Sequence, residues 1–129
     1  MQLDNLYKGV VIKFKNADQF CAGTFDRIEG ITAIIIQDNI EHIFYKDKYN
    51  LTWGVEKSIK VPGIGILKVG DVITPGKKIA TSFTAFKHTL FIDHFFVIDE
   101  GNIWVKARNL PLGLDKDLDT KMYGKTWTR

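Results

Sequence analysis

The sequence has few of the residues on which disulfide-stabilised domains and common catalytic sites depend. It contains one cysteine, Cys21, so neither a disulfide nor a cysteine-based zinc site can form within one chain. Its two serines, Ser58 and Ser82, lie in no Gly-x-Ser-x-Gly motif. Gly63-Ile-Gly65 precedes a predicted strand rather than a helix, so it is not a dinucleotide fingerprint, and no phosphate-binding loop occurs. We therefore expect a protein that is not an enzyme and uses no metal or other cofactor.

The chain also lacks long apolar runs and a strong charge. No run approaches the ~20 apolar residues that span a bilayer. Residues 1–9 carry an early acid and no apolar stretch of the kind found in signal peptides. The formal net charge of +3 is lower than is typical of a dedicated nucleic-acid binder. These features predict a protein of the cytoplasm or of a virion that does not associate with a membrane.

Short apolar segments separated by turn signals are what the sequence does contain. Apolar and polar side chains alternate from residue 10 to residue 15, which predicts a strand with one buried face. Gly23, inside the next predicted strand, indicates a bulge or a sharp bend. Strands are predicted at residues 7–15, 20–28, 31–37, 40–45, 64–69, 79–86, 88–99 and 103–108, with shorter extended pieces at 55–61 and 70–76. The sequence therefore predicts an all-β fold, an antiparallel meander of about eight or nine strands that forms a small barrel or a two-layer sandwich.

These strands are assigned to one β domain at residues 1–113, followed by a C-terminal tail at 114–129. A short helix is expected within residues 115–122 of the tail, and the tail is expected to dock on the domain or on a partner. The turns at Glu29-Gly30 and Glu100-Gly101 both follow a Phe-containing strand, but their flanks do not align. The sequence leaves open two fused small sheets and does not indicate an internal duplication.

Two stretches resemble known families. Thr24-Phe-Asp-Arg-Ile-Glu-Gly-Ile-Thr-Ala-Ile-Ile-Ile36, with Val69-Gly-Asp-Val-Ile73, resembles a small bacterial β-barrel family of unknown function. That resemblance covers about half of the chain; it implies a barrel and assigns no site. The stretch from His94-Phe-Phe-Val-Ile-Asp99 to Leu118-Asp-Thr-Lys-Met-Tyr-Gly124 is similar to the C-terminal part of type I signal peptidases. Those enzymes need a Ser before a Met-Pro step and a downstream Lys, and this chain has neither arrangement, so no peptidase activity is implied.

Residues 88–99 form the longest apolar and aromatic run and are predicted to be the central strand. His88 and His94 would lie roughly 20 Å apart at ~3.3 Å per residue, too far to share a metal ion. Both faces of this strand are apolar, whereas a lone small sheet usually has one wet face. Asp93 is the exception, because a carboxylate on an apolar face needs a partner or solvent. The candidate partners are Arg27, Lys106 and Arg108.

Large apolar groups on this strand and in the tail predict contact with another subunit. The predicted interface residues are Phe91, Asp93, Phe95, Tyr123 and Trp127. We expect a homo-oligomer or a larger protein assembly in which the chain is a non-catalytic structural or accessory protein. A virion or phage component fits that description.

The alternative function is a binding module for single-stranded nucleic acid or a nucleotide-type ligand. Residues 45–60 resemble a long functional loop in which aromatic rings and cations occur together, as they do where small β-barrels bind nucleic acid. The predicted ligand-binding residues are Tyr45, Lys46, Lys48, Tyr49, Trp53, Lys57 and Lys60. Asp47 and Glu56 weaken the positive field of this segment. Protein–protein contact is therefore the favoured interpretation.

Overall fold

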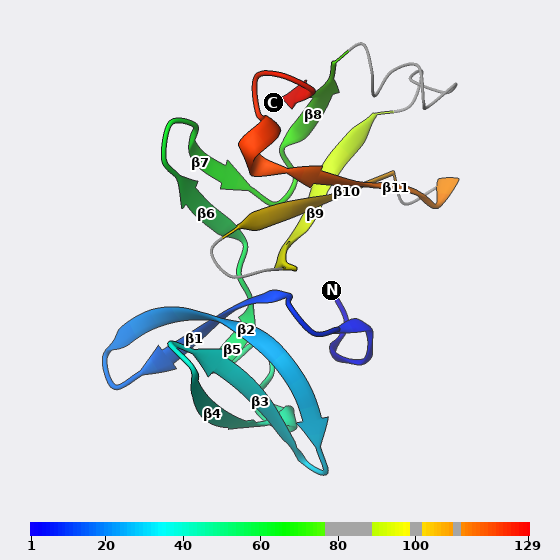
Figure 1. Cartoon of the computed structure of the whole chain (residues 1–129). Coiled ribbons are helices and arrows are strands. Elements are labelled where there is room, and N and C mark those ends of the chain that lie inside the picture. Colours follow the sequence, from blue (N-terminus) through cyan, green and yellow to red (C-terminus); the bar gives the residue numbers. More distant parts are fainter. Residues whose placement is uncertain (77–88, 99–101, 110–111) are drawn as a thin grey trace. The chain divides into compact units, whose positions relative to one another are not determined.

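The structure is a computed structural model, and it describes residues 1–76, 89–98, 102–109 and 112–129 (Figure 1). The regular elements of the described residues are antiparallel strands and short 3₁₀ helices, which confirms the all-β prediction. The chain divides into two compact units, Met1–Glu56 and Lys57–Arg129. None of the helices in the described ranges is long and apolar enough to cross a membrane.

The first unit is a meander of four strands with a fifth strand that returns to the first. Its elements are η1 (Leu3–Asn5), β1 (Val11–Asn16), β2 (Gln19–Glu29), β3 (Thr32–Gln37), β4 (Ile40–Tyr45), η2 (Lys46–Lys48) and β5 (Trp53–Val55). The strands lie in the order β4-β3-β2-β1-β5. Asp38 and Asn39 join β3 to β4 with positive φ at both positions, as the central residues of a type I′ hairpin have.

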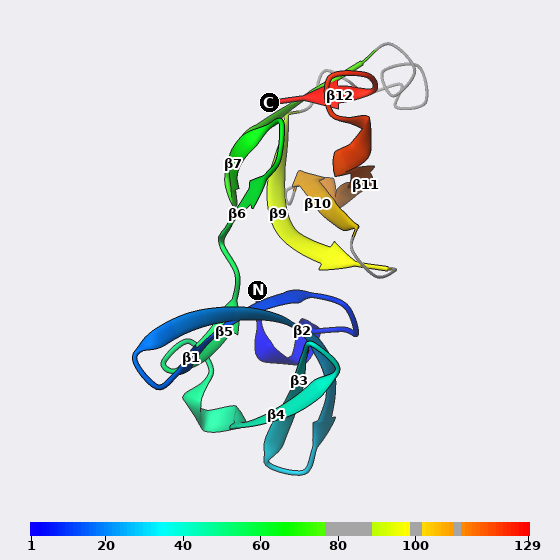
Figure 2. The same cartoon turned by 60° about the vertical axis from the view of Figure 1, so that its left-hand side comes forward.

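The first sheet curls on itself because β2 bends. Residues 19–24 of β2 pair with β1, whereas residues 24–29 pair with β3, and β2 is the long arched ribbon of Figures 1 and 2. The rings of Phe14 on β1 and Phe44 on β4 lie 5.2 Å apart. In a flat sheet, strands in these positions would be about 14 Å apart, at ~4.8 Å per strand. The first unit is therefore a strongly curled sheet, and its buried core is Val10, Ile12, Phe14, Phe25, Ala33, Ile35 and Trp53.

The second unit begins with a separate hairpin and continues with a second five-stranded sheet. The hairpin is β6 (Ser58–Val61) and β7 (Gly65–Lys68). The sheet elements are β8 (Val72–Pro75), β9 (Leu90–Val97), β10 (Ile103–Asn109), β11 (Leu114–Asp119), η4 (Thr120–Met122) and β12 (Trp127–Thr128). The C-terminal Arg129 donates to the carbonyl oxygen of Ile66 at 2.5 Å, which ties the end of the chain to the hairpin.

The two five-stranded sheets repeat one topology. The second has the order β11-β10-β9-β8-β12, which matches β4-β3-β2-β1-β5 strand for strand, and in both a 3₁₀ helix precedes the last strand. The indole N–H of Trp53 donates to the carbonyl of Tyr45, and that of Trp127 donates to the carbonyl of Asp119, at 2.8 Å in each case. Two fused small sheets, left open by the sequence, are thus what the structure has, and they form a structural repeat that the sequence did not indicate.

The boundaries also differ from the predicted division into a domain at 1–113 and a tail at 114–129. Residues 114–119 form strand β11, which pairs with β10, and β12 pairs with β8, so the predicted tail belongs to the second sheet. The helix expected within 115–122 is limited to the short η4 turn. Residues 45–60, predicted as a loop, contain η2, β5 and part of β6. The predicted strand at 79–86 and His88 lie outside the described residues.

Candidate functional site

Each five-stranded sheet carries an aspartate at a β-bulge in its second strand, β2 in the first unit and β9 in the second. The register between β2 and β3 shifts between Phe25 and Arg27, which leaves Asp26 as the extra residue. In the second unit Ile92 and His94 pair with neighbouring residues of β10, Ala107 and Lys106. Asp93 is therefore the extra residue. A bulge re-aims the side chain of the extra residue relative to the regular alternation. Both aspartates lie beside cations as a result.

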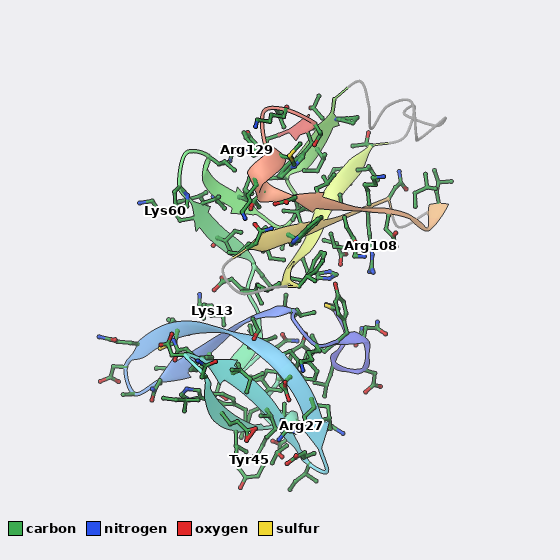
Figure 3. All side chains as sticks on the ribbon, viewed as in Figure 1. Lys13, Arg27, Tyr45, Lys60, Arg108 and Arg129 are labelled. Carbon is green, nitrogen blue, oxygen red and sulfur yellow. The ribbon has the colours of Figure 1, made fainter. Side chains whose placement is uncertain are left out.

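In the first unit the cation is Arg27, which contacts three carboxylates. It donates to Asp26, to Glu29 at 2.8 Å and to Glu41 on β4 at 3.0 Å. These hydrogen bonds, first that to Glu29, raise the pKa of Arg27 above its ordinary value. Because the network is exposed, it contributes little to stability, but it fixes a charged group on the surface of the first unit. Figure 3 labels Arg27 there.

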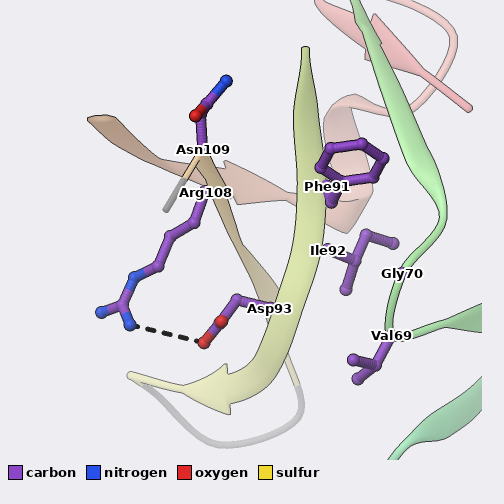
Figure 4. A pocket seen from close by; sticks show the side chains of 7 residues that line it. All are labelled: Val69, Gly70, Phe91, Ile92, Asp93, Arg108 and Asn109. Carbon is purple, nitrogen blue, oxygen red and sulfur yellow. Dashed lines mark hydrogen bonds and ion pairs between the residues drawn. The ribbon is translucent and has the colours of Figure 1, made fainter. Parts of the chain in front are cut away.

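In the second unit Asp93 contacts His94 and Arg108. The Nδ1 atom of His94 lies 2.6 Å from an oxygen of Asp93, and Arg108 approaches the same oxygen at 3.5 Å (Figure 4). Arg108 was one of the three predicted partners; the other two, Arg27 and Lys106, pair with other acids. Burial lowers the pKa of His94, while the hydrogen bond with Asp93 acts in the opposite direction. His94 is therefore a buried imidazole held by the bulge carboxylate.

An open pocket of about 450 Å³ lies beside this pair in the second unit. Its lining is Val69, Gly70, Phe91, Ile92, Asp93, Arg108 and Asn109 (Figure 4). Phe91 is 43% exposed and stands directly opposite Arg108 on the neighbouring strand. The amide nitrogen of Asn109 donates to the carbonyl of Thr89, whereas its buried Oδ1 accepts no hydrogen bond. Because Asp93 and Arg108 compensate each other's charge, this pocket is suited to a largely apolar group.

The predicted ligand-binding residues of 45–60 are divided between the two units. Tyr45, Lys46, Lys48, Tyr49 and Trp53 belong to the first unit, and Lys57 and Lys60 belong to the second. Trp53 is 3% exposed and its indole N–H is used within the unit, so it offers no open face for stacking. The hydroxyl of Tyr49 donates to the carbonyl of Met1 at 2.7 Å. Tyr45, by contrast, is 58% exposed at the end of β4 (Figure 3).

The predicted interface residues also separate by burial. Phe95 and Trp127 are core residues of the second unit, and Trp127 is only 1% exposed. The ring of Tyr123 packs edge-on against Trp127, with ring centroids 5.0 Å apart. The large groups in the predicted tail are thus explained by packing within their own unit. Phe91 and Asp93 line the pocket.

Three exposed apolar side chains lie along β4, an edge strand of the first sheet, and of these the sequence singled out only Tyr45, as a ligand-binding residue. Other exposed apolar side chains, such as Phe20 and Ile31, lie outside β4. Ile43 is 67% exposed, and Tyr45 follows it on the same face of the strand. The equivalent edge strand of the second sheet, β11, has Asp117 and Asp119 at the matching positions of its ladder. The signal in the sequence is the run Ile40-Glu-His-Ile-Phe-Tyr45, in which both faces carry large apolar groups.

Within the described residues no group of three or more His, Cys, Asp or Glu side chains is arranged to hold a metal ion. Comparison with protein-family models, curated proteins and solved structures finds no match for this chain.

Proposed function

We propose that this chain is a non-catalytic interaction protein that acts through protein–protein contacts, and that the outer face of β4 is its contact surface. In this role the chain is a structural or accessory component of a larger assembly. The supporting observation is the difference between two equivalent edge strands of one repeated topology. The first presents Ile43 and Tyr45, and the second presents Asp117 and Asp119.

The physical reason is that an edge strand offers unpaired backbone groups and therefore attracts another strand. Proteins normally protect such an edge with charged side chains. On β11 the ion pair of Asp117 with Lys106 places charge at the edge and provides that protection, whereas Ile43 and Tyr45 do not. Apolar area removed from water contributes about 25 cal/mol per Å², so covering these side chains favours association. Strand β4 has exposed apolar side chains at its edge and can therefore bind a partner, whereas the equivalent strand β11 is protected against such pairing.

The experiment is affinity purification of the tagged chain, followed by quantitative mass spectrometry. Wild type is compared with Ile43→Lys and with Leu51→Lys. Leu51 is a matched control, because it is 75% exposed in the same unit but lies outside β4. We expect proteins recovered with wild type, including an untagged copy of the chain expressed beside it, to be lost with Ile43→Lys and retained with Leu51→Lys. Equal recovery with all three would contradict the proposal.

A second candidate function, binding of a nucleotide-type ligand, is favoured by the pocket of the second unit rather than by residues 45–60. Phe91, which is 43% exposed, supplies an aromatic ring beside Arg108. A stacked base has complementary chemistry. Calorimetric titration with adenosine monophosphate tests this function, with Phe91→Ala as the variant that should abolish binding. No heat change with wild type would remove this candidate.

A further inference from the structure

The pocket of the second unit has two opposite charges in a largely apolar lining. Val69 and Phe91 are 38% and 43% exposed, so both side chains offer apolar surface to a ligand. The charges are those of Asp93 and Arg108, with 3.5 Å between Oδ2 of the carboxylate and Nη1 of the guanidinium (Figure 4). A cavity of about 450 Å³ has the size of a small-molecule site, and such sites combine apolar walls with a few placed polar groups.

Backbone pairing holds the walls of this pocket together. Phe91 on β9 stands directly opposite Arg108 on β10. The carbonyl of Ile92 accepts from the N–H of Gly70 at 2.8 Å, which attaches the segment that precedes β8 to β9. The bulge in β9 re-aims the carboxylate of Asp93, which contacts Arg108. The charged and apolar side chains are therefore positioned by paired segments of one sheet.

Each charge of the pocket retains capacity for a further polar group. The contact of 3.5 Å between Asp93 and Arg108 is longer than a normal hydrogen bond, and among the described residues the guanidinium makes no other polar contact. His94 and Arg108 both contact Oδ2 of Asp93, so within the same described part of the chain Oδ1 has no partner. In the first unit, by contrast, Arg27 contacts three carboxylates.

We propose that this pocket binds a free α-amino acid with an apolar side chain. The ammonium group of the ligand contacts Asp93, its carboxylate contacts Arg108, and its side chain packs against Phe91. The nitrogen and the carboxylate carbon of an amino acid are about 2.5 Å apart, so the ligand presents its two charges at a spacing close to that of the protein pair. A guanidinium also matches the two oxygens of a carboxylate in geometry.

Charge complementarity favours a zwitterion over a ligand of one charge. An apolar carboxylate would pair with Arg108 but would be repelled by Asp93, and an apolar amine would meet the reverse. A nucleoside monophosphate offers a phosphate to Arg108 and no cation to Asp93. A zwitterion pairs with both groups. An amino-acid site does not depend on the protein contacts of β4, and it takes a different ligand from the nucleotide-type function.

The first test is calorimetric titration of the wild-type chain with phenylalanine and three analogues. Phenylpropanoate lacks the ammonium group, phenethylamine lacks the carboxylate, and glycine lacks the apolar side chain. We expect phenylalanine to bind and each analogue to bind at least about tenfold more weakly, because each loses either a charge-assisted hydrogen bond or the apolar contact. No binding of phenylalanine, or equal binding of any analogue, would overturn the proposal.

The second test changes the selectivity of the pocket with two variants and a control. Asp93→Asn should weaken the binding of phenylalanine and strengthen that of phenylpropanoate, because the repelling carboxylate is removed. Arg108→Met should weaken the binding of phenylalanine and strengthen that of phenethylamine for the corresponding reason. Lys60→Ala removes an exposed cation of β6, outside the pocket, and should leave every affinity unchanged. Equal loss of all ligands in a variant that circular dichroism shows to be folded would overturn the assigned contacts.

The outcomes separate amino-acid binding from the two proposed functions. If adenosine monophosphate binds and phenylalanine does not, the amino-acid site is overturned and the nucleotide-type function remains. If phenylalanine binds with the expected selectivity but Ile43→Lys loses no protein partner, the amino-acid site stands and the protein-contact function fails. If phenylalanine does not bind and partners that depend on Ile43 are recovered, the amino-acid site fails and the protein-contact function stands.

Discussion

His94 is a buried imidazole whose protonation is governed by a few identified groups. Asp93 lies on its own strand, and Arg108 and Lys106 face it from β10. Burial lowers the pKa of His94, and the two cations also lower it, whereas Asp93 raises it. Since an unfolded histidine titrates near pH 6.5, the unfolded state takes up a proton before the folded state does.

We therefore predict that stability falls when the pH is lowered from about 7.5 to about 5.5. The contribution of His94 is fully present above about pH 6.5 and is lost as the pH falls from there toward the lowered folded-state pKa. Urea unfolding of the full chain at several pH values measures it. His94→Gln should give a shallower dependence on pH, whatever its absolute stability. Identical slopes for the two proteins would show that His94 does not carry the effect.

Gly23 shows how far a single residue can be interpreted from sequence. A glycine inside a predicted strand indicated a bulge or a sharp bend. A Cβ placed at Gly23 would lie 2.6 Å from the carbonyl oxygen of Ile36, so close approach is the reason for this glycine. The bulge itself is at Asp26. No local pattern distinguishes an aspartate at a bulge from one in a regular strand, because the difference lies in the partner strand.

At the scale of single elements, β9 explains the apolar character of both faces of the central run. Leu90 and Ile92 are buried before the bulge, and Phe95 is buried after it. The extra residue Asp93 reverses the alternation of side chains along the strand. Residues that an unbroken strand would place on opposite faces, such as Ile92 and Phe95, therefore lie on the same face. The sequence therefore predicted the strand correctly, but strict alternation along it gives the wrong face for every residue beyond Asp93.

Strand β11 was missed for a different reason. Its sequence, Leu-Asp-Lys-Asp-Leu-Asp, has charged groups at every position except two, which made it resemble a solvated tail. As an edge strand it has a neighbour on one side only, and acidic groups are tolerated on its outer face. A charge-rich edge strand and a charged tail are alike in composition, so tertiary pairing is needed to tell them apart.

The short strand β12 should depend strongly on Trp127. This side chain is buried in the second unit, and its indole N–H bonds to the carbonyl of Asp119. We predict that Trp127→Ala destabilises the second unit by about 3–5 kcal/mol, and that Trp127→Phe costs less because it keeps most of the packed ring. Urea unfolding followed by circular dichroism measures both changes. An unchanged stability in Trp127→Ala would instead indicate a residue that docks on a partner.

At the scale of the whole molecule, the repeat left one short signal in the sequence. Tyr49-Asn-Leu-Thr-Trp53 and Tyr123-Gly-Lys-Thr-Trp127 share Tyr, Thr and Trp at the same spacing, and both follow a 3₁₀ helix. The flanks of the turns at Glu29-Gly30 and Glu100-Gly101 do not carry this signal. The connection between β9 and β10 is longer than that between β2 and β3, so flanking residues fall out of step. The two sheets are therefore alike in strand pairing and in buried residues, whereas the lengths of their connections differ.

The repeat also predicts that the first unit can fold without the second. Residues 1–56 contain all five strands of one sheet, its buried core and the Trp53–Tyr45 hydrogen bond that closes it. A fragment of this size buries only about 60% of the surface of its unfolded chain, so its stability should be low but sufficient for a cooperative transition. We expect fragment 1–56 to give a dispersed amide NMR spectrum, and Trp53→Ala in that fragment to abolish it. A fragment with the spectrum of an unfolded chain would contradict this expectation, and would mean that the repeated topology does not correspond to an independent folding unit.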